Sequence, residues 1–282
     1  MRVARYESPQ LSWEMVTRDA AAPLRKHVRN YTGYVERTAK PLVRREVPTG
    51  DVTLIISPDT TLRLPDVRDG SRPPASHGSF VAALHDTHAL VEHDGYQHGI
   101  EVRLTPLGAH RLFGLSMDEL TNRVVELDDL LGRGAEELVG RLWDVAGWEA
   151  RFDLLDRLIA ARVDEARPAS EGVAWAWQQL RETQGRVAVG SLATELGWSH
   201  RRLIARFREQ VGMPPKTIGR VLRFENVSRA LIGTPEPRLA EVAFDCGYYD
   251  QAHLNRDFRD FSGMTPGAYL AARLPEGGGV SG

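Results

Sequence analysis

The spacing of apolar positions changes its period once along the chain, near residue 105. Before that point, short apolar or alternating stretches are separated by turn residues, as at 48–51. Ile100, Val102 and Leu104 alternate with charged residues, so we expect this stretch to bury one face. The pattern predicts about seven strands in a sandwich or small barrel. The expected strands are 28–35, 42–47, 52–56, 61–64, 80–84, 89–93 and 98–104, with a loop over 66–78.

From residue 106 on, apolar residues recur every three or four positions, which is the spacing of helices. The expected helices are 107–113, 117–124, 128–142, 148–163 and 171–183, and the stretch 162–169, which contains Pro168, is the expected linker. We therefore predict an α+β chain of two domains. These are a β-rich, cupin-like or sandwich domain that ends in helices over 1–165 and an all-α domain over 170–273, followed by a disordered glycine-rich tail over 274–282.

The most informative pattern is an internal repeat between residues 189 and 266. Each copy has a short helix with an apolar stripe, a glycine, a capping residue and a second helix with a polar face, which is the pattern of a helix-turn-helix. The second helices are expected at about 200–211, capped by Ser199, and 251–261, capped by Asp250. Matching positions in the two copies are Leu192 and Val242, Ala193 and Ala243, Gly197 and Gly247, Leu203 and Leu254, Phe207 and Phe258, and Pro215 and Pro266.

A continuous helix is expected between the copies, over 217–231. Its length of about 22 Å would set two recognition helices toward successive faces of the major groove. One chain would then read a bipartite site in double-stranded DNA without forming a dimer.

Charge differs between the two copies. Between Arg186 and Ala230 there are nine Lys and Arg against three Glu, a net of +6, which favours phosphate binding. Between Arg238 and Arg273 there are four Lys and Arg against five Asp and Glu, a net of −1, and Asp257 is among the acids. We expect the second helix to add selectivity but little phosphate affinity. Its side chains suited to reading base edges are Gln251, His253, Asn255 and Arg256.

Residues 197–216 resemble the first helix-turn-helix of the AraC/XylS family of transcription regulators, and 241–266 resemble the family signature over the second. The resemblance covers roughly residues 171–273. It implies base contacts from both recognition helices. By position, these fall on Arg201, Ile204 and Ala205 in the first helix and on Gln251, Ala252, His253 and Arg256 in the second. We expect Arg202 and Arg206 to contact phosphate.

The β-rich half is also similar to the N-terminal domains of some AraC-type regulators, over 45–56, 99–109 and 124–130. In the family that domain is often a cupin-like barrel that binds an effector or forms a dimer. The resemblance therefore implies a DNA-binding transcription regulator that responds to a small-molecule effector. It also implies two candidate partners: a second copy of this chain, in a homodimer, and RNA polymerase.

Two alternatives stay open. The N-terminal domain could mediate only protein contacts, or it could carry an enzyme. The enzyme is disfavoured, because the sequence has no phosphate-binding glycine loop, no serine or cysteine nucleophile motif and no carboxylate pair at a defined spacing. We expect no catalytic residues and no cofactor.

Five of the nine histidines fall between 77 and 98, at positions 77, 85, 88, 93 and 98. Their spacing matches no standard zinc pattern, so no metal site is predicted. Only His98 shares the strand parity of Ile100, which makes it the one candidate effector contact.

Composition sets the remaining limits. The 282 residues carry 36 Lys and Arg against 38 Asp and Glu, an overall charge of −2 that conceals the basic segment. The single cysteine, Cys246, fits a reducing compartment. The sequence shows neither an apolar run of eighteen residues nor the core of a signal peptide, so we expect a cytoplasmic protein with no membrane partner.

Overall fold

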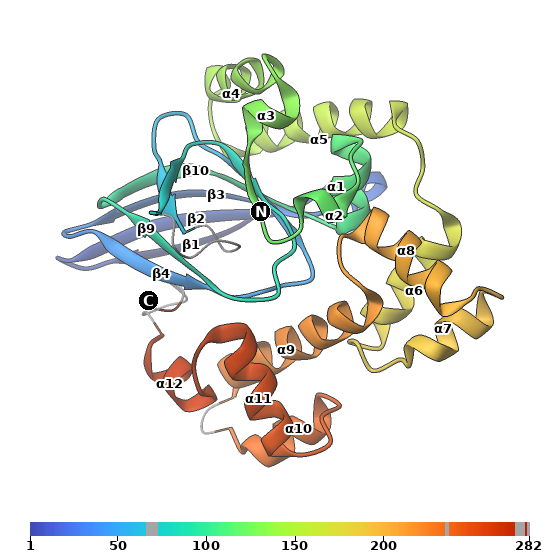
Figure 1. The fold of residues 1–282 in the computed structure, drawn as a ribbon. Helices are drawn as coiled ribbons and strands as arrows, with labels where there is room; N and C mark the ends of the chain where they lie inside the picture. The colour runs from blue at the N-terminus through green and yellow to red at the C-terminus, as the bar shows by residue number, and fades with distance from the viewer. Residues whose placement is uncertain (66–72, 235–236, 274–279, 281–282) are drawn as a thin grey trace.

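A computed structural model of the chain describes residues 1–65, 73–234, 237–273 and 280. The strands, blue to cyan in Figure 1, lie together on one side of the molecule. The helices of the last third of the chain, yellow to red, lie along the other side. The tail predicted over 274–282 lies outside the described residues except for Val280. Of the loop predicted over 66–78, only residues 73–78 are described.

The N-terminal region contains two antiparallel sheets. A seven-stranded sheet has the order β1-β2-β3-β10-β5-β8-β11, and a four-stranded sheet has the order β4-β9-β6-β7. The strands of the first are β1 (Arg2–Glu7), β2 (Leu11–Asp19), β3 (Val28–Thr38), β10 (Tyr96–Leu104), β5 (Val52–Ile56), β8 (Phe80–Ala82) and β11 (Val124–Glu126). Those of the second are β4 (Leu42–Glu46), β9 (Ala89–His93), β6 (Leu62–Leu64) and β7 (Ala75–His77).

Alternation along β10 gives the larger sheet two different faces. Ile100, Val102 and Leu104 are fully buried in the core between this sheet and the helices that follow it. Glu101 and Arg103 point to the opposite face, toward the smaller sheet. The strand is central, because Ile100 to Leu104 pairs with β5 on one side and with β3 on the other. The predicted alternation is confirmed, and both of its faces are covered.

Five helices complete this region: α1 (Pro106–Phe113), α2 (Met117–Leu120), α3 (Leu127–Leu131), α4 (Gly134–Asp144) and α5 (Trp148–Glu165). Two predicted helices were wrong in extent. The helix predicted over 117–124 ends at Leu120, and Val124 begins β11, which pairs with Ala82 of β8. A short apolar run suits either structure, and here the available sheet edge decides. The helix predicted over 128–142 is interrupted at Gly132, whose φ is 58°.

The C-terminal region is all helical, as predicted. The first helix-turn-helix is α7 (Val189–Glu195) with α8 (His200–Val211), and the second is α10 (Leu239–Asp245) with α11 (Gln251–Ser262). Helix α9 (Pro215–Gly233) joins them, and at 19 residues it spans about 28 Å, longer than predicted. Helices α6 (Glu171–Glu182) and α12 (Pro266–Ala271) stand at the two ends.

The predicted turns and caps of both copies are confirmed. Gly197 and Gly247 have φ values of 61° and 78°, a backbone conformation that favours glycine. The Ser199 hydroxyl accepts a hydrogen bond from the Arg202 amide at 3.2 Å. The Asp250 carboxylate accepts one from the His253 amide at 2.7 Å. These contacts fix where each recognition helix begins.

The hydrophobic core does not follow the two-domain division predicted from the sequence. One continuous cluster runs from the larger sheet through α1, α2 and α5 into the first helix-turn-helix, where Leu203 and Phe207 are fully buried. A second cluster holds α9 to α12, around Phe224, Phe258 and Phe261. The first helix-turn-helix therefore packs with the N-terminal region, while the second shares its core with α9.

Candidate DNA interface and sensor cavity

Helix α8 turns its polar side outward because Leu203 and Phe207 point inward. Arg201, Arg202, Ile204, Ala205 and Arg206, the residues predicted to contact DNA, are all exposed. Ile204 is 38% exposed, which is unusual for isoleucine and compatible with contact to a thymine methyl group. The Arg206–Glu209 ion pair, at 2.8 Å, is exposed and therefore weak, so it leaves the guanidinium available to phosphate.

Helix α11 presents a similar but smaller polar face. Gln251, Ala252 and Arg256 are exposed, and His253 and Asn255 are half-buried. The His253 ring packs edge-on against Tyr248, which fixes its orientation. The Oδ1 atom of Asn255 is enclosed and has no hydrogen-bond partner among the described residues. The amide oxygen of Asn255 is consequently not accessible to DNA in this arrangement.

The acids of the second copy do not all face outward. Asp257 is 4% exposed and bonds Arg220 of α9 at 2.8 Å, and Asp260 bonds the same guanidinium at 2.8 Å. The hydrogen bonds that Arg220 donates to Asp257 are the main reason that the pKa of this guanidinium is raised. The net of −1 counted from the sequence therefore does not describe the charge on the open face of α11, where Arg256 and Arg259 are exposed.

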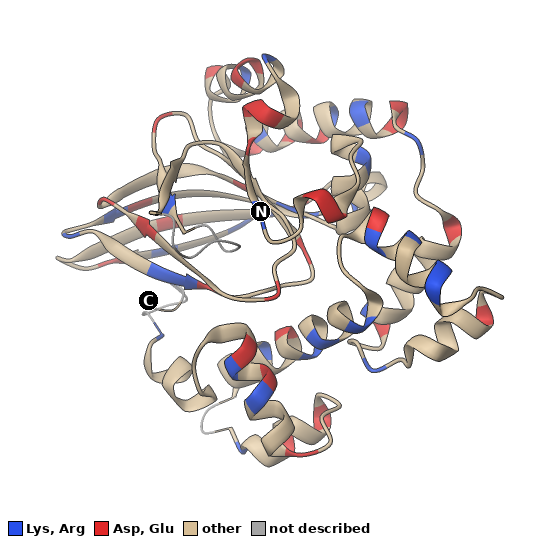
Figure 2. Cartoon of the chain, in the orientation of Figure 1, with Lys and Arg blue, Asp and Glu red and all other residues tan. Residues whose placement is uncertain are grey.

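The basic count of the first copy is reduced in the same way. Besides Arg220, Arg223 donates to the Gly185 carbonyl at 2.6 Å, and Arg229 pairs with Glu225 at 2.9 Å. Figure 2 shows that blue segments mark α8, α9 and α11, with red segments among them. Arg220 and Arg223 of α9 thus hold the fold together, whereas Arg229, like the arginines of α8, is exposed and its ion pair is weak.

A cavity of about 330 Å³ lies between the two sheets. Its size is within the range of small-molecule sites. Residues of both sheets line it, because the inward positions of β3 and β10 face the inward positions of β4 and β9. Ile55, Leu64 and Phe80 form an apolar part of the lining. The charged part consists of Glu36, Arg44, Glu46, Asp51, Glu101 and Arg103.

The sequence did not predict this charged lining. The one signal in the sequence is the alternation of Glu101 and Arg103 with apolar residues, and this alternation predicts only a single buried face. Arg103 donates to Glu101 at 2.8 Å, and this neighbour is the main reason that the pKa of Arg103 is raised. Burial raises the pKa of Tyr34, which also lines the cavity.

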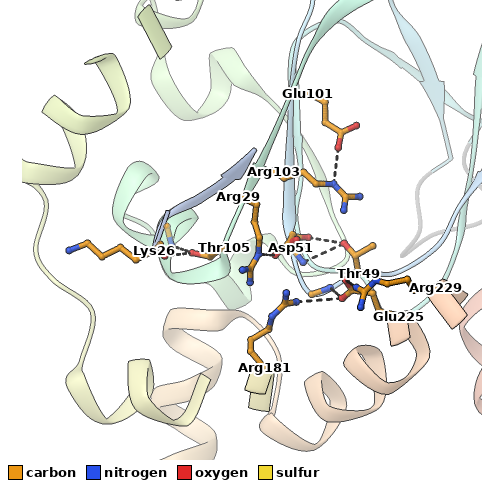
Figure 3. Close-up of polar contacts among 12 residues, drawn as sticks. Lys26, Arg29, Thr49, Asp51, Glu101, Arg103, Thr105, Arg181, Glu225 and Arg229 are labelled. Atoms are coloured by element: carbon orange, nitrogen blue, oxygen red, sulfur yellow. Dashed lines mark hydrogen bonds and ion pairs between the residues drawn. The ribbon is translucent and has the colours of Figure 1, made fainter. Parts of the chain in front are cut away.

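The 48–51 loop connects the cavity to the C-terminal region (Figure 3). Thr49 and Asp51 line the cavity, and between them the Gly50 amide donates to the Glu225 carboxylate of α9 at 3.2 Å. Arg181 of α6 lies 3.5 Å from the same carboxylate. On the other side of the loop, Arg29 donates to Asp51 at 2.9 Å.

Both recognition helices also contact the N-terminal region at their C-terminal ends. Thr121, after α2, donates to the Gly212 carbonyl that follows α8, at 2.9 Å. Arg45 of β4 donates to the Ser262 carbonyl at the end of α11, at 3.0 Å. The His88 ring lies against Gly263, so closely that a side chain there would overlap it. The N-terminal halves of both helices, which carry the residues predicted to read bases, are not part of these contacts.

The five clustered histidines do not converge. His77 bonds Glu126, His88 lies beside Gly263, and His93 lies in the cavity wall. Among the described residues, no group of three or more potential ligands could hold a metal ion.

His98, the candidate effector contact, shares the face of Ile100 as predicted, but this face packs on the helices. Its ring lies edge-on to Trp143 and Trp148, and the cavity is on the other side of the strand. Strand parity identified an inward face correctly, but it could not say which face bordered the cavity.

In the part of the chain that the structure describes, no helix is both long and apolar enough to cross a membrane.

Comparison with known proteins assigns the two halves separately. Residues 192–272 match a family described as a helix-turn-helix domain, and residues 17–126 match a domain of unknown function, DUF6597. The chain matches no curated protein.

Several solved structures are similar. ToxT from Vibrio cholerae O395 is 8% identical with a TM-score of 0.47, over 94% of this chain and 98% of that one. ToxT from strain SCE256 with a bound unsaturated fatty acid is 10% identical with a TM-score of 0.47, over 95% and 97%. The C-terminal domain of AraT, a response regulator from Geobacillus stearothermophilus, is 24% identical with a TM-score of 0.36, over 38% and 90%.

Two helix-turn-helices joined by one long helix, behind a β-rich region, define the chain as a DNA-binding transcription regulator. The assignment rests on the family model over 192–272, together with the doubled motif. This match confirms the resemblance of the C-terminal region to the helix-turn-helix domain of AraC-type regulators.

Proposed function

We propose that this regulator reads a bipartite site in double-stranded DNA with α8 and α11, and that a small molecule in the cavity controls it. The observation that carries effector control is the 48–51 loop. It forms part of the cavity wall and hydrogen-bonds α9, the helix that joins the two recognition helices. A ligand that moves this loop acts directly on the DNA-binding region.

The proposed reading of DNA divides into base contacts and phosphate contacts. On α8, Arg201 reads a base edge, Ile204 and Ala205 contact thymine methyl groups, and Arg202 and Arg206 bind phosphate. The exposure of all five residues supports this assignment. On α11, the proposed base contacts are Gln251, Ala252, His253 and Arg256, and Asn255 contributes through its accessible atoms.

Effector control requires two states with different affinity for the ligand. In the proposal, one state is the arrangement described above, in which the N-terminal region contacts the ends of both recognition helices. The other differs at the 48–51 loop and so in how α9 presents α8 and α11. A homodimer and RNA polymerase remain proposed partners, and cytoplasmic location follows from action on chromosomal DNA.

The test of bipartite reading is selection of bound sequences from randomised duplexes by the full chain. The expected result is two half-motifs, separated by about one helical turn. Arg201→Ala should erase the information in one half-motif and Gln251→Ala in the other. Arg167→Ala, at an exposed position between α5 and α6, is the matched control and should leave both intact. A single motif, or loss of the same half in both variants, contradicts bipartite reading.

A further inference from the structure

The cavity contains more carboxylates than guanidinium groups. The excess of negative charge lies inside the protein, because all of these side chains line the space between the two sheets. A negative lining disfavours anionic ligands and favours cationic ones. The carboxylates are those of Glu36, Glu46, Asp51 and Glu101, and the guanidinium groups are those of Arg44 and Arg103.

The guanidinium groups are already committed to carboxylates. Arg44 bonds both carboxylate oxygens of Glu36, and Gln97 adds a third hydrogen bond to Glu36 at 2.6 Å. Arg103 bonds Glu101 at 2.8 Å. A ligand carboxylate would have to break one of these pairs and leave a buried protein carboxylate without a partner, which is costly.

Asp51 is paired with Arg29, which lies outside the cavity lining, at 2.9 Å. Glu46 is then the remaining carboxylate, and it forms no hydrogen bond or ion pair among the described residues. Glu46 lines the cavity and keeps an exposed surface, and the protein around its carboxyl raises the pKa of that group through burial. The nearby charge of Glu101 raises this pKa further, and Arg44 and Arg103 lower it to a smaller extent. The pKa of Tyr269 in α12 is raised mainly by burial and to a smaller extent by the charge of Glu46.

The rest of the lining suits an apolar body and one hydrogen-bond acceptor. Ile55, Leu64 and Phe80 offer an apolar wall. His93 is 2% exposed, and burial lowers the pKa of its imidazole. Its Nδ1 accepts from the Gly95 amide at 3.3 Å, so Nε2 carries the proton, yet Nε2 has no hydrogen-bond partner among the described residues. Its nearest carboxylate oxygen, on Glu36, is 3.7 Å away.

We propose that the cavity binds a small organic cation, an amine or guanidine with an apolar body, whose charge lies between Glu46 and Glu101. The apolar body packs on the wall formed by Ile55, Leu64 and Phe80. The inference rests on the proposed function only in that the same cavity serves as the effector site. Binding pairs the cation with Glu46, and any proton that Glu46 holds beforehand is released to solvent.

The test uses the full chain and three matched sets of probes. These are 2-phenylethylamine and hexylamine, the neutral 2-phenylethanol and hexan-1-ol, and the anionic 3-phenylpropanoate and hexanoate. Thermal unfolding and titration calorimetry should show that the amines bind at least about tenfold more tightly than the matched alcohols, as expected for a hydrogen bond between charged groups. Glu46→Gln should remove that preference while leaving alcohol binding unchanged.

Glu136→Gln, at an exposed position on α4, is the control and should keep the preference for amines. The inference is overturned if amines bind no better than alcohols, or if Glu46→Gln weakens both classes equally, as a merely structural change would. If an alcohol or carboxylate binds and shifts operator affinity, effector control stands without the cation site. If an amine binds and operator affinity does not change, the cation site stands and effector control fails.

Discussion

Replacing Gly50 with alanine tests the contact between the 48–51 loop and α9. A Cβ atom at this position would lie 2.6 Å from Cδ2 of Leu222 and 3.0 Å from the Arg181 guanidinium. Leu222 is 5% exposed and has little room to move, whereas the end of Arg181 can shift. The new methyl group should therefore push the loop away from α9 and weaken the hydrogen bond from Gly50 to Glu225.

The magnitude follows from two opposing effects. Alanine in place of glycine restricts the unfolded chain, which stabilises a protein by about 0.4–1 kcal/mol where the backbone allows it. Overpacking costs about 1–3 kcal/mol, and the weakened hydrogen bond to a charged acceptor adds to that cost. We expect Gly50→Ala to lower the free energy of unfolding by about 1–3 kcal/mol. For a chain of this size, that is a fall in Tm of roughly 2–4 °C per kcal/mol.

The assay is thermal and urea unfolding of the full chain, with Gly78→Ala as control. No atom lies within 4 Å of a Cβ at Gly78, so that substitution should be neutral or slightly stabilising. Leu222→Ala removes the methyl group that the new Cβ would overlap. The double variant Gly50→Ala, Leu222→Ala should therefore lose less free energy of unfolding than the sum of the losses in the two single variants. Equal stability of Gly50→Ala and Gly78→Ala would refute the close approach.

Three further predictions concern single side chains. Arg201→Ala should weaken operator binding by about 1–3 kcal/mol and by more than Arg256→Ala, measured by gel shift, and the reverse order would contradict this. Glu46→Gln should stabilise the protein at neutral pH, because a pKa that is raised in the native state means that ionising this carboxyl opposes folding. The gain should be absent in acid, grow as pH rises from the unfolded pKa to the raised native pKa, and then level off, which Tm measured across pH will show. Asp257→Asn should lower the free energy of unfolding in urea by about 1–3 kcal/mol, because it breaks a largely buried ion pair. Asp260→Asn, at a 63% exposed carboxylate, should lower it by less than about 0.5 kcal/mol, and similar losses in the two variants would contradict this prediction.

The C-terminal region could be predicted in detail because its signals are local. Helix caps such as Ser199 and Asp250, and turns such as Gly197, depend on residues within one or two helical turns. The repeat supplied a second copy of each signal. The same local reasoning placed the strands 52–56 and 89–93 within the sequence, but it could not assign them to different sheets.

The candidate site could be predicted only in part, because its remaining features join distant residues. The contact between Gly50 and Glu225 spans 175 positions, and the pairing of Arg220 with Asp257 spans 37. Counting charges along a segment treats each as exposed, so it assigned Asp257 to the DNA-facing side. The charged cavity was missed for the same reason, since Glu101 looks solvent-facing until a second sheet covers it.

The two hydrophobic clusters divide α9 between them: Ile218 and Leu222 belong to the cluster of the N-terminal region, and Phe224 and Leu231 belong to the other. Cooperative unfolding units tend to coincide with such packed clusters. Amide hydrogen exchange should then separate α10–α12 from the rest of the chain, with the first helix-turn-helix exchanging together with the sheet. A fragment that begins at α6 would lose much of the support for α8 but keep the support for α11, so the DNA-binding region is only half a transferable module.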